Sequence, residues 1–291
     1  MRERDLVEEE MARPRMDAAL DALAAFPDNP PRDETGAIDH GALPSESIRV
    51  RRWGERRVSM STLNGDQVLE LRGALPRFLR VAYEIEAPWH EYTQESMGYM
   101  HNGGMVKMAN FLDAVWRSDE RRHGPYFRAA YLAVTGEKDV DPNPHVVDPV
   151  MPGASALERH FYMRLIAELG ASSAYTVYAS LTRDDLQNAM VNVAGDEYRH
   201  LAVFWAALKW RFGDVMAWRL LKVGQTAALL GVTHHSNRSG LNDGVTAQDA
   251  AMVGRIGLTM SSVVLRLLAW DRSLTRTRLQ DVFGSVPAMV H

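Results

Sequence analysis

The sequence predicts an all-α protein built around a four-helix bundle. Apolar residues recur at intervals of three and four over six long segments, as in helices that bury one face. These segments span residues 67–100, 105–135, 155–181, 184–212, 214–231 and 247–282. Of the 291 residues, 46% are hydrophobic and 24% are charged, which is the composition of an ordinary folded protein. We therefore interpret residues 1–291 as a single globular domain.

Turn-forming residues separate the predicted helices. Residues 101–104 include two glycines that favour positive φ, and residues 182–185 supply a turn and a helix cap. Four prolines between residues 136 and 153 exclude a regular helix, so a long crossover is expected there. Two helical hairpins joined by one long crossover have the connectivity of ferritin-like bundles.

Additional segments flank the predicted bundle at residues 67–212. Within residues 1–66, a helix is expected over residues 5–25, followed by an irregular wrap rich in Pro, Gly and Arg. Residues 213–291 are predicted to add C-terminal helices to the bundle.

Composition excludes several classes of protein and site. The absence of cysteine excludes disulfides, zinc–thiolate sites and iron–sulfur clusters, so any bound metal needs His and carboxylate ligands. A formal net charge of -4 gives no overall basic footprint for nucleic acid. The charged N-terminus lacks an apolar signal core, and no later stretch offers about 18 uncharged apolar residues. We expect a cytoplasmic protein that binds neither membrane nor nucleic acid.

One motif occurs twice on predicted helices. Residues 119–123 read Asp-Glu-Arg-Arg-His and residues 196–200 read Asp-Glu-Tyr-Arg-His, so four of five positions agree. A Glu and a His three residues apart lie on the same helical face and can bind one metal ion together. Each motif therefore supplies a candidate ligand pair.

A two-metal site in a helical bundle also requires one Glu from each of the other two helices. Glu168 lies as far before the turn at residues 182–185 as Glu197 lies after it. The neighbouring residues, such as Leu165 and Leu169, are apolar and are a poor environment for a carboxylate without a partner. Glu168 is therefore the candidate ligand from the third helix.

The fourth ligand is either Glu84 or Glu86. Paired with Glu120, either residue places the hairpin turn near residues 102–103. Helical periodicity favours Glu86, which shares a face with apolar residues, whereas Glu84 shares one with charged residues. Pro88, however, is expected to kink this helix and makes comparison of faces across it unreliable. The residues themselves leave this choice open.

Three segments resemble the soluble acyl-carrier-protein desaturases of plants and mycobacteria. They are Asp-Glu-Arg-Arg-His-Gly at residues 119–124, with Tyr-Leu-Ala-Val-Thr-Gly following at 131–136, Ala-Gly-Asp-Glu-Tyr-Arg-His at 194–200, and Glu168-Leu169. The resemblance covers about residues 75–205. In that family the first ligand precedes a proline by four residues, which favours Glu84 slightly because Pro88 follows it.

The resemblance implies a dimeric ferritin-like bundle that binds two iron ions and uses dioxygen to insert a double bond into an acyl chain. It also implies an electron donor such as ferredoxin and an acyl carrier protein that presents the chain. Asp119 and Asp196 would each accept the outer imidazole N–H of the His on the opposite helix. The implied iron ligands are Glu84 (or Glu86), Glu120, His123, Glu168, Glu197 and His200.

Side chains near the predicted site could also line a substrate channel. These are Trp89, Thr93, Met97, Trp116, Ala171, Ser172, Tyr175 and Phe204. The chain departs from the family at Ala171, where the family has a threonine beside the iron, which leaves the family's proton delivery without its threonine here. A di-iron monooxygenase or N-oxygenase of a small substrate is therefore an alternative. A non-catalytic ferritin-like protein that only binds iron is another.

Two expectations concern partners. Five arginines between residues 49 and 57 form a local positive cluster that could steer an acidic carrier protein, although pairing with acidic groups of the bundle explains it equally well. A homodimer is expected from the family resemblance, with the first helical hairpin as its interface.

Overall fold

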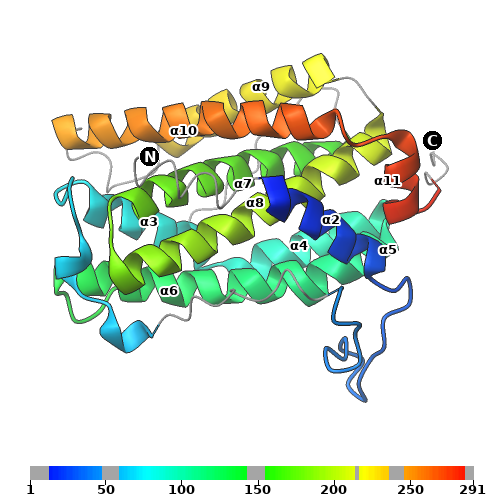
Figure 1. The fold of residues 1–291 in the computed structure, drawn as a ribbon, viewed down its shortest axis with the longest axis horizontal. Coiled ribbons are helices and arrows are strands. Elements are labelled where there is room, and N and C mark those ends of the chain that lie inside the picture. Colours follow the sequence, from blue (N-terminus) through cyan, green and yellow to red (C-terminus); the bar gives the residue numbers. More distant parts are fainter. Residues whose placement is uncertain (1–12, 48–58, 143–154, 214–215, 236–245, 286–291) are drawn as a thin grey trace.

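The computed structural model describes residues 13–47, 59–142, 155–213, 216–235 and 246–285. Within these ranges every long element is a helix, and pairing of extended backbone is limited to two isolated bridges. One bridge joins Arg32 to Ile38 and the other joins Val68 to Thr182. The predicted all-α fold class is confirmed (Figure 1).

Four helical arms form the bundle. The first arm is α3 (Leu75–Glu86) and α4 (Trp89–Asn102); the second is α5 (Val106–Phe111), a π-helical segment (Leu112–Trp116) and α6 (Arg117–Thr135); the third is α7 (Ala156–Ser180); the fourth is α8 (Asp184–Phe212). Helix α7 packs along α8, and α3 packs along α6. Contacts of α4 with α7 and of α6 with α8 close the bundle.

Residues 67–69 fasten one end of the bundle. The backbone N–H of Leu69 donates to the carbonyl of Leu181, and the N–H of Arg183 donates to the carbonyl of Gln67, both at 2.8 Å. The Gln67 side chain also accepts the backbone N–H of Leu186 at the start of α8. The entrance to the first hairpin is therefore held against the turn of the second hairpin.

Two predicted helices contain irregularities that the periodicity did not specify. The segment predicted at residues 67–100 begins its helix only at Leu75, and Pro88 divides it into α3 and α4. The kink expected at Pro88 is therefore confirmed. The helix predicted at residues 105–135 contains the π-helical segment Leu112–Trp116, whose wider turn rotates all following side chains relative to a regular α-helix.

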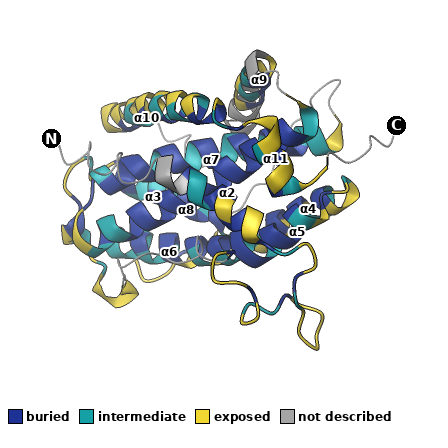
Figure 2. Ribbon diagram, turned by 45° about the vertical axis from the view of Figure 1, so that its right-hand side comes forward, coloured by how far each residue is buried: buried dark blue, intermediate teal, exposed yellow. Residues whose placement is uncertain are grey.

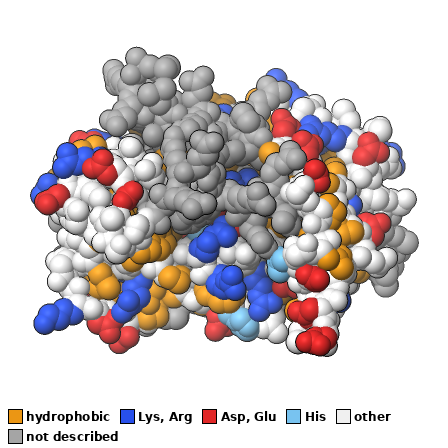
Figure 3. All heavy atoms as spheres, turned by 60° about the horizontal axis from the view of Figure 1, so that its bottom comes forward, with side chains coloured by type: hydrophobic (Ala, Val, Ile, Leu, Met, Phe, Trp, Pro, Cys, Tyr) orange, Lys and Arg blue, Asp and Glu red, His pale blue; other side chains and the backbone are white. Residues whose placement is uncertain are grey.

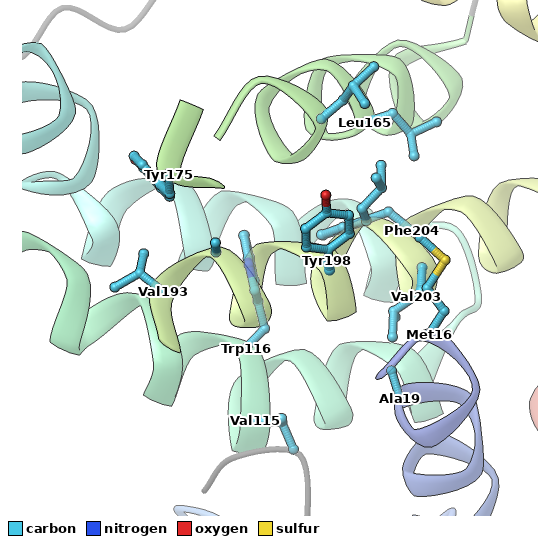
Figure 4. Close-up of a cluster of buried hydrophobic side chains, with 14 of the residues drawn as sticks. Met16, Ala19, Val115, Trp116, Leu165, Tyr175, Val193, Tyr198, Val203 and Phe204 are labelled. Carbon is cyan, nitrogen blue, oxygen red and sulfur yellow. The ribbon is translucent and has the colours of Figure 1, made fainter. Parts of the chain in front are cut away.

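The N-terminal helix covers the outer face of the bundle. Helix α2 (Arg13–Ala25) packs across α8, and its Met16 and Ala19 lie beside Val203 and Phe204 of α8 (Figure 4). All four side chains are at least 97% buried. The described part of the helix predicted at residues 5–25 therefore agrees with the prediction and encloses the side of α8 that carries the second motif.

Three C-terminal helices follow α8. They are α9 (Met216–His235), α10 (Ala247–Asp271) and α11 (Arg276–Phe283), so the single helix predicted at residues 247–282 is divided in two. Helix α10 begins with a capping box between Thr246 and Asp249 and packs along α7. The bundle is thereby covered by a further helical layer on the α7 side (Figure 1).

The outward face of α10 is apolar. Val253, Leu258 and Leu265 are each more than half exposed, and Figure 2 shows exposed residues along this helix. By length and mean hydropathy alone, α10 is the one described helix that could cross a membrane, a test that core helices of soluble proteins also pass. From the sequence we excluded only stretches of about 18 uncharged apolar residues. Helix α10 is not such a stretch, because it contains Arg255.

The described surface carries charges of both signs. Figure 3 shows Lys and Arg as well as Asp and Glu side chains over the face that it presents. Charges mixed in this way are typical of solvated helices. The arginine cluster at residues 49–57, for which steering of a carrier protein and pairing with acids of the bundle were both open, lies outside the described residues.

A buried ion pair connects the bundle to α10. Asp271 is 1% exposed, accepts the indole N–H of Trp205 at 2.6 Å and lies 3.0 Å from the ammonium of Lys209. We predict that Asp271→Ala lowers the free energy of unfolding by roughly 3–5 kcal/mol, because the buried cation loses its carboxylate. Urea unfolding monitored by circular dichroism measures this loss.

The matched control is Glu70→Ala, which removes an exposed ion pair with Arg255 and is expected to cost less than about 1 kcal/mol. Equal effects of the two substitutions would contradict the structural role assigned to Asp271.

Candidate metal centre

Six buried side chains from the four arms meet inside the bundle. They form two overlapping groups, and within each group the candidate ligand atoms all lie within 4.8 Å of one another. One group is Glu86, Glu120, His123 and Glu197, and the other is Glu120, Glu168, Glu197 and His200. Glu120 and Glu197 belong to both groups. Two adjacent sites that share two carboxylates are the arrangement of a two-metal centre in a helical bundle.

The structure decides between the two candidates for the fourth ligand. Glu86 is 4% exposed and lies in the cluster. Glu84 lies outside it, because its carboxylate pairs with Arg80 at 2.8 Å on a partly exposed side of α3. Glu84, which the family spacing before Pro88 favoured slightly, is therefore not among the clustered residues. The helical face, and not the distance to the proline, identifies the residue that points inward.

A close approach of two backbones places Glu86 at the centre. Glu86 is the last residue of α3, beside the break at Pro88. Gly124 of α6 faces this break, and a Cβ atom there would lie 3.2 Å from the carbonyl oxygen of Glu86. A residue without a side chain therefore lets α3 end directly against α6, next to His123.

Each imidazole turns its Nδ1 atom towards the carboxylates. His123 Nδ1 lies 3.0 Å from Glu197 Oε1 and 3.2 Å from Glu120 Oε2. His200 Nδ1 lies 3.2 Å from Glu197 Oε2 and 3.3 Å from Glu168 Oε2. The two motifs thus supply one nitrogen and one carboxylate each, and the Nδ1 atoms are the candidate metal ligands.

The outer nitrogen of each imidazole contacts the aspartate of the other motif. His123 Nε2 lies 3.2 Å from Asp196, and His200 Nε2 lies 3.3 Å from Asp119. This is the cross-helix pairing expected from the sequence. An Nε2–H donated to a carboxylate leaves Nδ1 with a lone pair for a metal.

The arginine shared by the two motifs neutralises these aspartates. Arg122 pairs with Asp119 and Arg199 pairs with Asp196, each three residues away on the same helix. Burial alone would raise the pKa of Asp119, but the His200 contact and the Arg122 charge lower it below its ordinary value. Sequence reasoning assigned no role to these arginines, although their identical position in both motifs was a usable signal.

Two phenols also contact the centre. The single hydroxyl proton of Tyr92 of α4 faces two acceptors, Glu120 Oε2 at 2.9 Å and Glu86 Oε2 at 3.2 Å, of which Glu120 is the nearer. Tyr175 of α7, predicted as a channel residue, donates to Glu86 Oε1. Tyr92 was not predicted, because it follows the break at Pro88 and shares no regular helical face with Glu86.

The crowded carboxylates shift one another's protonation. Burial and the nearby charge of Glu120 raise the pKa of Glu86 from its ordinary 4.5 to about 8. Burial opposes protonation of His123, but contacts with Glu120 and Glu197 raise its pKa to about 10. Burial and repulsion from Glu120 and Glu168 likewise raise the pKa of Glu197. Without bound metal, protons on these groups therefore reduce the negative charge of the clustered carboxylates.

The donor set and its geometry fit two divalent cations. His123 Nδ1, Glu168 Oε2 and Glu197 Oε1 are buried and have no hydrogen-bond partner among the described residues. Separations of 3.0–3.3 Å between ligand atoms match neighbouring ligands at about 2.1 Å from an octahedral ion. Four glutamates and two neutral imidazoles balance the charge of two divalent ions, which explains why so many acids are buried together.

The residues predicted to line a substrate channel are buried or half-buried in the core. Thr93, Trp116, Ser172, Tyr175 and Phe204 are at least 97% buried, and Trp89, Met97 and Ala171 are half-buried against the core. Of these eight, Trp116 lines a cavity of about 10 Å³ beside His200, which is the space of about one water molecule. A channel for an acyl chain stays a prediction.

Comparisons with known proteins add no assignment: no family model, no curated protein and no solved structure matches the chain. The likeness to acyl-carrier-protein desaturases therefore rests on the motifs alone.

We predict that the metal-free protein loses stability as the pH rises from about 6 to 9. Between pH 4.5 and 8, Glu86 is protonated in the folded protein and ionised in the unfolded chain, because folding raises its pKa. Between pH 6.5 and 10, His123 is protonated in the folded protein and neutral in the unfolded chain. Wherever the folded state binds more protons, raising the pH favours unfolding. Thermal melts of chelator-treated protein across this range measure the effect.

Metal-loaded protein is the control for this prediction. Its ligands are already deprotonated when folded, so its melting temperature is expected to depend less on pH over the same range. A melting temperature of the metal-free protein that stays constant or rises from pH 6 to 9 would contradict the protonation described above.

Proposed function

We propose that this protein binds two iron ions and uses them to activate dioxygen for the oxidation of an organic substrate. The observation that carries the proposal is the convergence of four buried glutamates and two histidines from four helices. A mixed carboxylate and imidazole donor set suits iron or manganese, and the absence of cysteine removes thiolate alternatives. Bound iron would supply the redox chemistry that reduces dioxygen and removes hydrogen from the substrate.

In this proposal the protein positions the metal ions and excludes water. Glu120 and Glu197 belong to both groups and would bridge the ions, while the two imidazoles are oriented by Asp119 and Asp196. Aromatic packing seals the centre: the Trp116 ring lies edge-on to His200 and to Phe204. Charge that develops inside the centre would therefore be stabilised by fixed protein groups and not by solvent.

The resemblance to desaturases supplies the most specific form of the proposal. The substrate would be an acyl chain on a carrier protein, and the electron donor would be a ferredoxin-like protein. Removal of two hydrogen atoms from the chain, with two electrons and two protons from outside, reduces one dioxygen to two waters. A homodimer with the first hairpin at its interface belongs to the same proposal.

We predict that Glu86→Gln and Glu197→Ala abolish binding of two iron ions per chain, because each removes a charged oxygen ligand from the centre. Helical circular dichroism should be retained, since neither residue is part of the apolar core. Elemental analysis after anaerobic loading with Fe²⁺ and gel filtration measures the iron content.

Glu84→Gln is the matched control. It removes the same charge two residues away, outside the cluster, and should keep two iron ions per chain. If Glu84→Gln loses iron and Glu86→Gln retains it, the assignment of the centre is wrong.

Dioxygen consumption by iron-loaded protein tests the catalytic part of the proposal. With excess chemical reductant and an acyl-carrier-protein substrate, sustained consumption with formation of an unsaturated chain is expected. Hydroxylated product would instead support the monooxygenase alternative. Consumption that stops once the bound iron is oxidised, whatever the substrate, would support an iron-binding protein without catalysis.

A further inference from the structure

The two halves of the candidate centre have similar ligands but different support. In the half that contains His123, both oxygens of Glu86 contact phenols: Oε1 accepts the Tyr175 hydroxyl, and Oε2 lies 3.2 Å from the Tyr92 hydroxyl, whose one proton it shares with Glu120. The two tyrosines come from different arms, α7 and α4. Glu86 is therefore fixed from two directions before any ion binds.

A cation above one phenol reinforces this arrangement. The guanidinium of Arg164 lies over the Tyr92 ring, 5.2 Å from its centroid. A cation over the ring face is attracted to the negative face of the aromatic ring, which favours this position of the Tyr92 ring. The Tyr92 hydroxyl also contacts Glu120 at 2.9 Å, so one ring orients two carboxylates of the same half.

The half that contains His200 lacks such support. Glu168, which corresponds to Glu86 in this half, lies 3.3 Å from His200 Nδ1, and its Oε2 atom has no hydrogen-bond partner among the described residues. No hydroxyl in the described part of the chain donates to it. No phenol therefore orients Glu168 in the described part of the chain, whereas two phenols contact Glu86.

We infer that the two metal sites are inequivalent, and that Tyr92 and Tyr175 are positioning residues that make the Glu86 site bind the first ion. Ligands that are already oriented lose less conformational freedom when an ion binds, so the site with fixed ligands has the higher affinity. The Glu168 site binds the second ion and is the half in which ligands rearrange. This inference rests on the proposed two-metal function.

Titration of the metal-free protein with Mn²⁺ alone tests the inference without any assay of activity. Electron paramagnetic resonance distinguishes free, isolated and coupled Mn²⁺. In the unmodified protein, the first equivalent should give an isolated bound ion, and coupled pairs should form only with the second. Two sites filled together with one affinity would overturn the inference while leaving the two-metal proposal intact. No binding of Mn²⁺ would overturn both.

Tyr92→Phe and Tyr175→Phe test the two phenols separately. Each keeps the ring and removes one hydroxyl, and each should weaken the first binding step about tenfold to a hundredfold, the usual effect of losing a group that orients a metal ligand. Tyr178→Phe is the matched control on α7, because its ring lies beside Tyr175 but contacts no ligand. A change confined to the second step, or equal changes in all three variants, would contradict the inference.

Glu168→Gln and Glu86→Gln provide a test that does not depend on the tyrosines. Glu168→Gln should retain one Mn²⁺ bound with the affinity of the first step, because the supported half is intact. Glu86→Gln should retain at most one weakly bound ion. The opposite order of affinities would show that the Glu168 site binds first, and the inference would fail.

Discussion

The rest of the structure depends on the burial of four glutamates within a few ångströms of one another. Glu86, Glu120, Glu168 and Glu197 are each at most 4% exposed, and an isolated buried carboxylate is among the most costly groups a protein can contain. Such a cluster persists only with positive charge inside it. Protons held by the glutamates and histidines provide that charge without metal, and two divalent ions provide it in the proposed functional state.

The surroundings of the centre confine this charge. Asp119 and Asp196 orient the imidazoles, and Arg122 and Arg199 neutralise those aspartates in turn. Outside this polar layer, Trp116 packs edge-on against aromatic neighbours, and helix α2 covers α8. The two aspartates are therefore paired with the imidazoles and arginines, and the apolar core separates them from solvent, which strengthens every electrostatic interaction within.

The near-repetition of the two motifs does not extend to the helices that face them. Each motif supplies Asp, Glu, Arg and His at matching positions, but the opposing glutamates differ in their partners. Glu86 meets two phenols, and Glu168 meets none among the described residues. In the proposed two-metal centre, one half would therefore have fixed ligands and the other half adjustable ones.

The sequence by itself determined the helical class, the hairpin turns and most of the residues of the buried Glu and His cluster, because these depend on local spacing. A Glu and a His three residues apart share a helical face wherever the helix packs. Only the tertiary structure decided between Glu84 and Glu86, because it shows which face of α3 packs against α6 beside Gly124. It also decided the roles of Tyr92 and Arg164, and the π-helical segment before Asp119, because these arise from packing between helices that no periodicity within one helix records.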